Sequence, residues 1–396
     1  MAVRRAMVIG VVLVVGLATF GSEALPASAR AVPPMTTATW HVQTSPNPSA
    51  TRFADLYDVA CPSTSNCVAV GQSSDTAYKN QARLLERWNG STWSIQSTPN
   101  PAGNPSTSFS SVACSSTSAC TAVGTSYTAN GDRALVERWN GSKWSLETAP
   151  TPSSGAAILY GVACPTATSC FAVGDSDATN GNPPLIEHWN GGSWSIQTVP
   201  HPTGVPFIFY SVACRATSDC TAVGEIPGSG GAASALAAHW NGSKWSVQTA
   251  ALPSGGRSSY LNDVRCPSAT QCLAVGDSYT PASGGLTATL GLAEVWNGHT
   301  WTSLAPPTPV SGAQDDFYGV ACPGVSKCVI VGSYDSTTVT PLAMRWDGST
   351  FAVDDTPGVG TFSYLYSVNC NGSNACVAVG AGEPSTLERT LVERSP

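Results

Sequence analysis

Residues 56–71 read LYDVACPSTSNCVAVG, and residues 84–96 read LLERWNGSTWSIQ. The first stretch holds two short apolar runs joined by a loop between two cysteines, which is typical of a pair of buried strands. The second holds two strand-like runs on either side of Asn89-Gly90. Asn-Gly is a strong signal for a two-residue hairpin, because both residues tolerate the positive φ that a type I′ turn requires. Residues 56–96 therefore predict four antiparallel strands, here named A to D in chain order.

The same unit recurs along the chain, because the cysteines form seven pairs with five residues between the members of each pair. From Cys61 to Cys370 is 309 residues over six intervals, a mean period of about 51.5 residues, which is typical of propeller blades rather than helical repeats. Four antiparallel strands per unit make one such blade. The pairs are Cys61 and Cys67, Cys114 and Cys120, Cys164 and Cys170, Cys214 and Cys220, Cys266 and Cys272, Cys322 and Cys328, and Cys370 and Cys376.

The two ends of the chain hold complementary halves of one repeat. The last unit stops at residues 391–394, a C strand with no D strand after it, while residues 40–43 form a D strand with no C strand before it. A propeller closes its ring in this way, whereas an open solenoid would have no reason to split a repeat. The sequence predicts an all-β, seven-bladed propeller over residues 30–396, with the N-terminal strand completing the last blade.

The repeat resembles a known family. The pattern Val-Ala-Cys-x5-Cys-x-Ala-Val-Gly followed by Trp-Asn-Gly-x-x-Trp is similar to that of a secreted bacterial family of tandem-repeat β-propellers, and it covers essentially the whole chain after residue 29. The resemblance implies a propeller fold and export. The family carries no assigned activity, so the resemblance transfers no catalytic residues.

The N-terminal segment predicts export. Arg4 and Arg5 precede an apolar run over residues 6–20, and Ala27-Ser28-Ala29 gives the small-residue pattern of a signal peptidase site. We expect residues 1–29 to be a signal peptide and the mature protein to be secreted. Because the run is shorter than the roughly 20 residues that cross a bilayer, a cleaved signal peptide is favoured over an uncleaved anchor, and no stable membrane insertion is expected after cleavage.

Charge excludes one class of partner. The chain has 18 Lys and Arg against 25 Asp and Glu, a net charge of −7, and only 11% of its residues are charged. Such a sequence offers no basic stripe to neutralise phosphates, so nucleic acid is not expected as a partner. An anionic membrane surface is excluded on the same ground.

An even number of regularly spaced cysteines in an exported chain predicts disulfides, since thiolate metal sites use shorter spacings. We therefore expect seven disulfides, each within an A–B hairpin, and no metal or other cofactor.

The other repeated residues are expected to be structural. The 12 tryptophans end strand C or open strand D in successive repeats, which predicts packing of outer strands between blades, with carbohydrate stacking by the more exposed ones as the alternative. Strand C also repeats a charge pair, which we expect to be solvated or to form cross-strand contacts. The pairs are Glu86 and Arg87, Glu137 and Arg138, and Glu393 and Arg394, with Glu187 and His188 as a near variant.

The two faces of such a ring differ in regularity. The A–B loops and C–D turns have nearly constant length and lie on one face, here called the fixed face. The B–C and D–A connections lie on the other, here called the variable face, and the longest of them is the predicted loop over residues 277–291. Because loops that vary on a rigid scaffold usually carry binding sites, we expect the ligand on the variable face.

Aromatic residues mark the candidate ligand site. Five tyrosines occupy one repeat position near the start of strand A, where they can stack sugars or, alternatively, pack between blades. Phe207 and Phe209 lie in the largest apolar cluster nearby and predict an exposed patch. The candidate ligand-binding residues are Tyr57, Tyr160, Tyr210, Tyr318, Tyr366, Phe207 and Phe209.

These features favour a monomeric, non-enzymatic binding module for glycan or cell-envelope material, and no residue is assigned a catalytic role. One alternative is a propeller glycoside hydrolase or lyase, which would need an acid pair such as Asp315-Asp316 at the channel mouth, where Arg52 or Arg257 could assist. The other alternative is a structural or protein-interaction disc, which would show a broad apolar patch on one face.

Overall fold

The computed structural model describes residues 37–396 except for 50, 76–80, 104–105, 130, 154, 177–182, 203, 252–257, 283–284, 336, 373–374, 385–386 and 396. The predicted signal peptide, residues 1–29, and Arg257 lie outside the described residues. Apart from a single 3-10 turn at Ser229–Gly231, the regular elements of the described chain are β-strands. None of its helices is long and apolar enough to cross a membrane.

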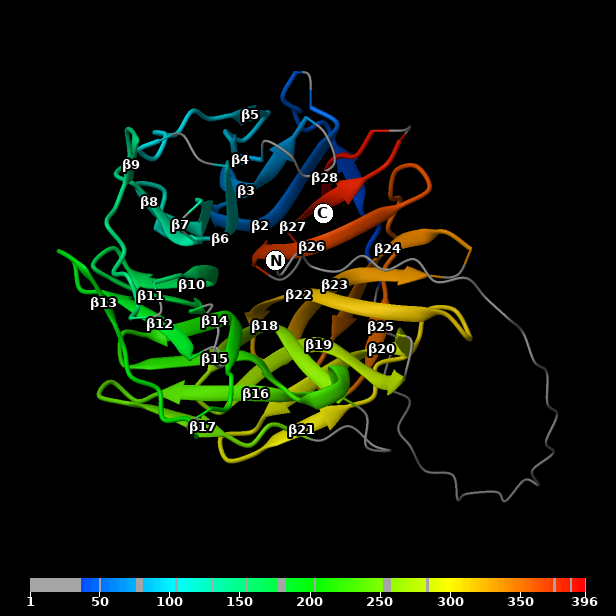
Figure 1. Ribbon diagram of the computed structural model, residues 1–396. Helices are drawn as coiled ribbons and strands as arrows, with labels where there is room; N and C mark the ends of the chain where they lie inside the picture. Colours follow the sequence, from blue (N-terminus) through cyan, green and yellow to red (C-terminus); the bar gives the residue numbers. More distant parts are fainter. Residues whose placement is uncertain are drawn as a thin grey trace, which may run out of the picture. The chain divides into compact units, whose positions relative to one another are not determined.

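Seven four-stranded antiparallel sheets form the seven blades, with strands A to D running from the centre of the ring outward (Figure 1). Blade 1 contains β2 (Phe53–Ser63), β3 (Asn66–Ser74), β4 (Ala82–Trp88) and β5 (Trp93–Ile95). Blade 2 contains β6 (Ser106–Ser116), β7 (Ala119–Tyr127), β8 (Arg133–Trp139) and β9 (Trp144–Leu146). Blade 3 contains β10 (Ile158–Thr166), β11 (Ser169–Asp175), β12 (Pro184–Trp189) and β13 (Trp194–Ile196).

The remaining blades repeat this order. Blade 4 contains β14 (Ile208–Ala216), β15 (Asp219–Pro227), β16 (Ala233–Trp240) and β17 (Trp245–Gln248). Blade 5 contains β18 (Ser258–Ser268), β19 (Gln271–Ala282), β20 (Gly285–Trp296) and β21 (Trp301–Leu304). Blade 6 contains β22 (Gln314–Gly324), β23 (Lys327–Asp335), β24 (Val339–Trp346) and β25 (Phe351–Val353), and blade 7 contains β26 (Ser363–Asn371), β27 (Ala375–Gly382), β28 (Arg389–Arg394) and β1 (His41–Gln43).

The N-terminal strand closes the ring, as the sequence predicts. Strand β1 pairs with β28 in antiparallel register, with His41 opposite Arg394 and Gln43 opposite Val392. Each innermost strand contacts the innermost strand of the next blade, and β26 of blade 7 contacts β2 of blade 1. The predicted all-β, seven-bladed architecture is therefore confirmed.

All seven predicted disulfides are present, one in each A–B hairpin, and no cysteine of the described chain is free. The paired Cα atoms lie 4.0–4.1 Å apart, which places the two cysteines side by side on neighbouring antiparallel strands. By the loop-entropy model each small ring stabilises the fold by about 2 kcal/mol. This density of disulfides fits an extracellular or secreted protein. The bonds join Cys61 to Cys67, Cys114 to Cys120, Cys164 to Cys170, Cys214 to Cys220, Cys266 to Cys272, Cys322 to Cys328, and Cys370 to Cys376.

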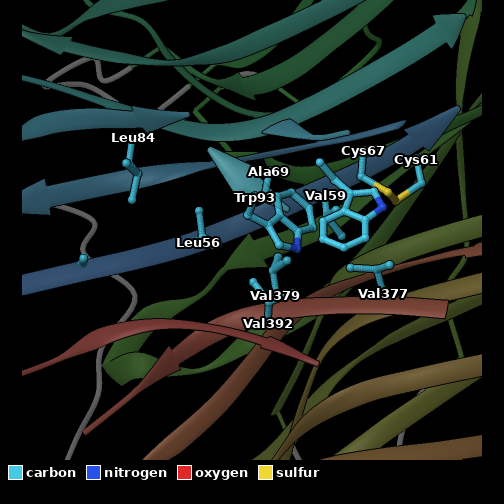
Figure 2. Packing of buried hydrophobic residues seen from close by; sticks show 12 residues of the cluster. Leu56, Val59, Cys61, Cys67, Ala69, Leu84, Trp93, Val377, Val379 and Val392 are labelled. Carbon is cyan, nitrogen blue, oxygen red and sulfur yellow. A yellow bond between two sulfur atoms is a disulfide. The ribbon is translucent and has the colours of Figure 1, made fainter. Parts of the chain in front are cut away.

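The hydrophobic core lies between blades rather than in one central mass. Figure 2 shows Leu56 and Val59 of blade 1 facing Val377, Val379 and Val392 of blade 7, and all five side chains are buried. Similar clusters join the other blades. Because each blade buries its faces against two neighbours, removing one blade would expose apolar surface on both sides of the gap.

The tryptophans pack where the sequence places them, at the outer hairpin of each blade. Trp88 and Trp93 lie with ring centroids 5.7 Å apart, and the same pair recurs in blades 2 to 5 at 5.7–5.8 Å. In blade 6 Phe351 replaces the second tryptophan, and its ring lies 6.4 Å from Trp346. The predicted packing role is confirmed.

The prediction for the strand C glutamates is wrong. Glu86, Glu137, Glu187, Glu294 and Glu393 occupy one repeat position, and their exposed fractions are all 0%. Their side chains face the preceding blade, since alternate residues of a strand point to opposite sides of the sheet and the neighbouring blade covers the inner side. Only the following residue of each pair, such as Arg87, lies on the partly exposed side.

The predicted loop over residues 277–291 is also wrong in form. Strands β19 and β20 continue far beyond the usual blade length, with Tyr279 opposite Thr289 and Ala282 opposite Gly285. Threonine and other strand-favouring residues extend the pairing, so that the insertion is a long two-stranded hairpin rather than an irregular loop.

Candidate functional site

Each innermost strand carries a β-bulge at the position of the predicted tyrosines. In β2, Leu56 lies opposite Gly71 and Asp58 lies opposite Val70, so that Tyr57 is an extra residue without a partner in β3. The same shift occurs in all seven blades. A bulge re-aims the side chain of its extra residue, and here it turns one residue per blade towards the axis of the ring, the region here called the central channel. The seven bulged residues are Tyr57, Ser110, Tyr160, Tyr210, Asn262, Tyr318 and Tyr366.

The glycine of the Val-Ala-Val-Gly run makes room for this bulge. A Cβ atom on Gly71 would overlap the backbone oxygen of Asp55, and one on Gly174 would overlap that of Ile158. No other amino acid fits against such a close backbone approach. The repeated glycine therefore allows the bulge that positions the channel residues.

The tyrosines converge in two groups. Tyr366 lies between Tyr57 and Tyr318, with ring centroids 5.7 and 5.5 Å away, and Tyr160 lies 5.6 Å from Tyr210. All five are half-buried. Ser110 and Asn262 separate the two groups because they are too short or too polar to extend the aromatic contacts. The five predicted tyrosines are thus brought together around one channel.

Carboxyl groups accept hydrogen bonds from several of these bulged side chains. The hydroxyl of Tyr57 donates to Asp55 Oδ2 at 3.1 Å, and that of Tyr210 donates to Glu225 Oε1 at 2.9 Å. Asn262 Nδ2 donates to Asp277 Oδ2 at 3.1 Å.

These acids come from two positions in the blade. Asp55 and Asp316 lie two residues before the bulge, while Asp175, Glu225 and Asp277 follow the strand B glycine. Both positions lie on the variable-face side of the bulge, because strand A runs from that face. The mouth of the channel is therefore lined by tyrosines and carboxyl groups together.

Carboxyl groups at the channel mouth have raised pKa values. Burial raises the pKa of Asp316 to about 6 and that of Glu388 to about 8, and the charges of Asp315 and Asp55 respectively add to these effects. Asp55 and Glu388 hydrogen-bond to each other, and burial raises the pKa of Asp55 as well. No Lys or Arg forms an ion pair with these acids in the described chain.

The same part of the chain holds no group of three or more His, Cys, Asp or Glu residues placed to bind a metal ion. Because burial raises the pKa values of Asp316 and Glu388, these carboxyl groups can donate hydrogen bonds when protonated and accept them when ionised.

A second layer of hydrogen bonds lies one residue further along the inner strands. Asp58 accepts bonds from the hydroxyls of Ser111 and Ser367 at 2.6 Å and from the backbone N–H of Val112 at 2.8 Å. Asp58 therefore links blades 7, 1 and 2 across the closure of the ring. Asp263 does the same for blades 4, 5 and 6, through Ser211 and the backbone of Val320. This layer fixes the scaffold below the tyrosines.

The predicted apolar patch is not on the surface. Phe207 is 3% exposed and Phe209 is 0% exposed, and both pack in the core between blades 3 and 4 with Phe171 and Trp245. Phe209 precedes the bulged Tyr210, so the two side chains point to opposite sides of the strand. The expectation of an exposed cluster here is wrong, because the bulge brings the tyrosine rather than the phenylalanine to the channel.

The adjacent acids Asp315 and Asp316 do not act as a pair in one site. Asp316 faces the channel, where the hydroxyl of Tyr318 lies 3.5 Å from its Oδ2. Asp315 is 2% exposed on the other side of the strand, where the backbone N–H of Gly291 donates to it. Arg52 is exposed on the variable face.

Sequence reasoning missed most of the acids at the mouth. Asp55, Glu225, Asp277 and Glu388 stand alone in the sequence, far from one another and without a motif. The signal that was present is positional, since three of the blades carry an acid directly after the strand B glycine. That position becomes informative only once the bulge is known to face it.

Comparison with known proteins supports the fold. No protein-family model matches the sequence, and no curated protein matches it. Among solved structures, YCF48 bound to D1 peptide is similar with a TM-score of 0.56 at 14% identity, covering 92% of this chain and 99% of that one.

Two further structures are similar at the level of fold. The GH74 xyloglucanase from Xanthomonas campestris has a TM-score of 0.54 at 11% identity, covering 89% of this chain and 55% of that one. A PL25 ulvan lyase bound to -[GlcA(1-4)Rha3S]- has a TM-score of 0.51 at 8% identity, covering 82% of this chain and 89% of that one. At these identities the likeness extends to the propeller fold alone.

Proposed function

We propose that the protein is an exported, monomeric, non-enzymatic binding module that recognises glycan or cell-envelope material at the channel mouth on the variable face. The observation that carries this proposal is the set of five bulged tyrosines with carboxyl groups beside them, which accept hydrogen bonds from the hydroxyls of Tyr57 and Tyr210. Aromatic faces suit the apolar faces of sugar rings, and carboxylates accept hydrogen bonds from sugar hydroxyls. The similar fold of a xyloglucanase and an ulvan lyase is consistent with a polysaccharide ligand.

A propeller hydrolase or lyase is the second candidate, and one observation favours it. Glu388 has a pKa raised to about 8, so it holds a proton at neutral pH as a general acid must. Its nearest carboxyl partner, Asp55, is in direct hydrogen-bond contact, whereas the two acids of glycosidases stand roughly 5–9.5 Å apart. Glu388 would therefore need a more distant partner, and the binding function is the better supported of the two.

A structural disc is the weakest of the three candidates. Its expected sign is a broad apolar patch on one face. Five of the exposed apolar residues lie one per blade on the outermost strands, namely Val42, Ile95, Leu146, Ile196 and Val247, and the others are Tyr127, Leu290, Val310, Val325 and Phe362. Single aliphatic residues at separate blades of a sheet edge do not form such a patch.

The test is retention of residues 30–396 on a panel of insoluble and immobilised polysaccharides, with soluble sugars as competitors and the supernatant assayed for released oligosaccharide. We expect retention that free sugar reverses and no released product. Released product would establish the enzyme instead. No retention on any polysaccharide would contradict the proposal and favour a protein ligand.

Two variants place the ligand at the channel mouth. Glu225→Gln removes the carboxylate that holds Tyr210 and should weaken retention about tenfold, since hydrogen bonds to charged groups contribute roughly 1.5–3 kcal/mol. Glu147→Gln makes the same change at the exit of strand β9, outside the channel, and should leave retention unchanged. Equal effects of the two variants would show that the ligand binds elsewhere.

A further inference from the structure

The charges of the described residues are divided between the two faces of the ring. On the fixed face, Lys and Arg near the A–B loops and C–D turns outnumber the acids, which are Asp219 and Asp347. The acids of the channel mouth all lie towards the variable face. The net charge of −7 therefore conceals a basic face. The basic side chains there are Arg87, Arg138, Lys143, Arg215, Lys244, Arg265, Lys327 and Arg394.

Part of this basic face is neutralised by neighbouring acids. In blade 4, Asp219 pairs with Arg215 at 2.6 Å and with His239 at 3.1 Å. In blade 5, Arg265 pairs with Asp263 at 2.7 Å. The positive charge of blades 4 and 5 is thus largely used within the fold.

Three arginines on the opposite half form no ion pair within the described residues. Arg394, Arg87 and Arg138 occupy one repeat position in the consecutive blades 7, 1 and 2, and we name them the arginine arc. The charge of Glu147 acts on Arg138 from beyond ion-pair distance. Lys143, in the exposed C–D turn of blade 2, adds a fourth positive charge beside the arc.

Each guanidinium of the arc is held in place by the next blade. Arg394, Arg87 and Arg138 lie over the rings of Trp88, Trp139 and Trp189, with distances to the ring centroids of 4.8, 4.6 and 4.3 Å. Each also donates one hydrogen bond from Nη2 to a backbone oxygen of that blade's A–B loop, those of Thr64, Thr117 and Ala167. A guanidinium has five N–H donors, of which Nη2 makes this one bond and Nε of Arg138 is buried, so donors remain on the half-buried side chains for a ligand. Stacking on tryptophan orients the plane and reduces the entropy that binding would otherwise cost.

The arc ends where other residues take the same position. In blade 3 it is His188, whose ring stacks on Phe171 at 4.3 Å and whose pKa is lowered by burial, which favours the uncharged imidazole. In blade 6 it is Arg345, which pairs with the buried Asp354 at 2.8 Å. Lys244 and Lys327, which are also exposed and in no ion pair of the described chain, lie singly in blades 4 and 6, so the grouped positive charge lies in the sector of blades 7, 1 and 2.

We propose that the arginine arc binds a linear polyanionic polysaccharide, one that carries carboxylate or sulfate groups along its chain. Planar guanidinium groups match such anions bidentately, and a series of them at one-blade intervals suits a polymer with repeated charges. The arc itself exposes no large apolar side chain for insertion into a bilayer. Its few positive charges are also fewer than the 6–10 phosphate contacts that strong nucleic-acid binders make. This surface lies on the face opposite the channel mouth, so the inference does not depend on the function proposed there.

The test measures binding of the full mature chain to polygalacturonate and to dextran sulfate, with uncharged dextran as the negative control, by calorimetry at several salt concentrations. We expect binding to both charged polymers, none to dextran, and a loss of affinity as salt rises. Arg87→Gln and Arg138→Gln should each weaken binding about fivefold, in the range of exposed charge contacts. Arg52→Gln removes the same charge from the exposed surface of the variable face and should change little.

Two further variants separate binding from folding. Lys143→Gln alters an exposed side chain and should weaken binding without a change in thermal midpoint. Arg138→Lys keeps the charge but loses the planar fork, and should retain only part of the affinity. Equal losses for Arg52→Gln and Arg138→Gln would overturn the proposal, as would undiminished binding by Arg87→Gln and Lys143→Gln. Equally tight binding of anionic lipid vesicles or single-stranded DNA through the arc would overturn the assignment to polysaccharide, and self-association that Arg87→Gln abolishes would assign the arc to a second copy of the chain.

Discussion

Replacing Glu187 with methionine should stabilise the protein at alkaline pH. Glu187 is 0% exposed, and neither of its carboxylate oxygens has a hydrogen-bond partner among the described residues. Burial raises its pKa from 4.5 to about 8. Blade 6 carries Met344 at the same repeat position, also fully buried, so the fold already accepts methionine there.

The size of the effect follows from the pKa. Because the folded pKa is raised, the folded protein holds this proton more tightly than the unfolded chain, and stability falls as pH rises from about 4.5 to about 8. The difference between 4.5 and about 8, at 1.36 kcal/mol for each pKa unit, sets an upper limit of about 5 kcal/mol. Local relaxation and water entry reduce this limit, so we expect Glu187→Met to gain roughly 2–4 kcal/mol over the wild type between pH 5 and pH 9.

The assay is urea unfolding of the disulfide-intact protein at pH 5, 7 and 9, compared among the wild type, Glu187→Met and Glu187→Gln. Glutamine keeps a buried polar group but does not titrate, so it should match methionine in pH dependence and be less stable at every pH. If the free energies of the wild type and Glu187→Met run parallel from pH 5 to pH 9, Glu187 does not titrate as argued.

A matched position gives the opposite expectation. Glu137 is the equivalent residue of blade 2, but Arg83 of blade 1 pairs with it at 2.9 Å, and both side chains are buried. Glu137→Met should destabilise the fold by about 3–5 kcal/mol, because it removes the carboxylate that balances the charge of the buried Arg83 guanidinium, whose other hydrogen bonds go to uncharged groups such as Thr98. A stabilising Glu137→Met would show that the ion pair is not what distinguishes the two blade interfaces.

Three further changes test the blade contacts. Ala134 occupies the position of Arg83 one blade later and lines a cavity of about 60 Å³. Ala134→Arg should therefore supply Glu187 with an ion-pair partner and raise the urea midpoint at pH 8. An unchanged midpoint would contradict this expectation. Gly174→Ala should destabilise by at least about 2 kcal/mol in urea unfolding because its Cβ would overlap a backbone oxygen, whereas Gly192→Ala, whose Cβ would only contact Asn190 Oδ1 at 3.7 Å, should be nearly neutral. Asp58→Asn should lower the thermal midpoint by several degrees, since an amide cannot accept all the hydrogen bonds by which Asp58 links three blades. An unaltered midpoint would show that Asp58 does not stabilise the closure of the ring.

The repeat made the architecture readable from the sequence. The spacing of Cys61 and Cys67, the Asn89-Gly90 turn and the split repeat at the two ends each express a local rule, and each recurs along the series of blades or closes it. Because seven copies of the repeat show the same local pattern, the fold can be predicted without the long-range information that a fold without repeats would require. For this reason the strand order, the disulfides and the closing strand are all confirmed.

The wrong predictions concern residues whose surroundings come from another blade. The sequence places Glu187 and Phe207 near solvent because their own strands are amphipathic or their neighbours are apolar. Their burial depends on the adjacent blade, which no pattern within one repeat describes. Arg87 and Arg138 likewise become available only because the carboxylates beside them in sequence turn inward.

By itself, the sequence determined the number of blades, the pairing of strands and the disulfide framework, since these follow from short-range spacing and turn chemistry. Only the tertiary structure decided which polar groups meet. The β-bulge opposite Gly71 turns Tyr57 into the channel, blades far apart in the chain bring Asp55 to Glu388, and charge divides between two faces. The physical reason is that burial and electrostatics depend on distances in space between blades, whereas the repeat pattern records only distances along the chain.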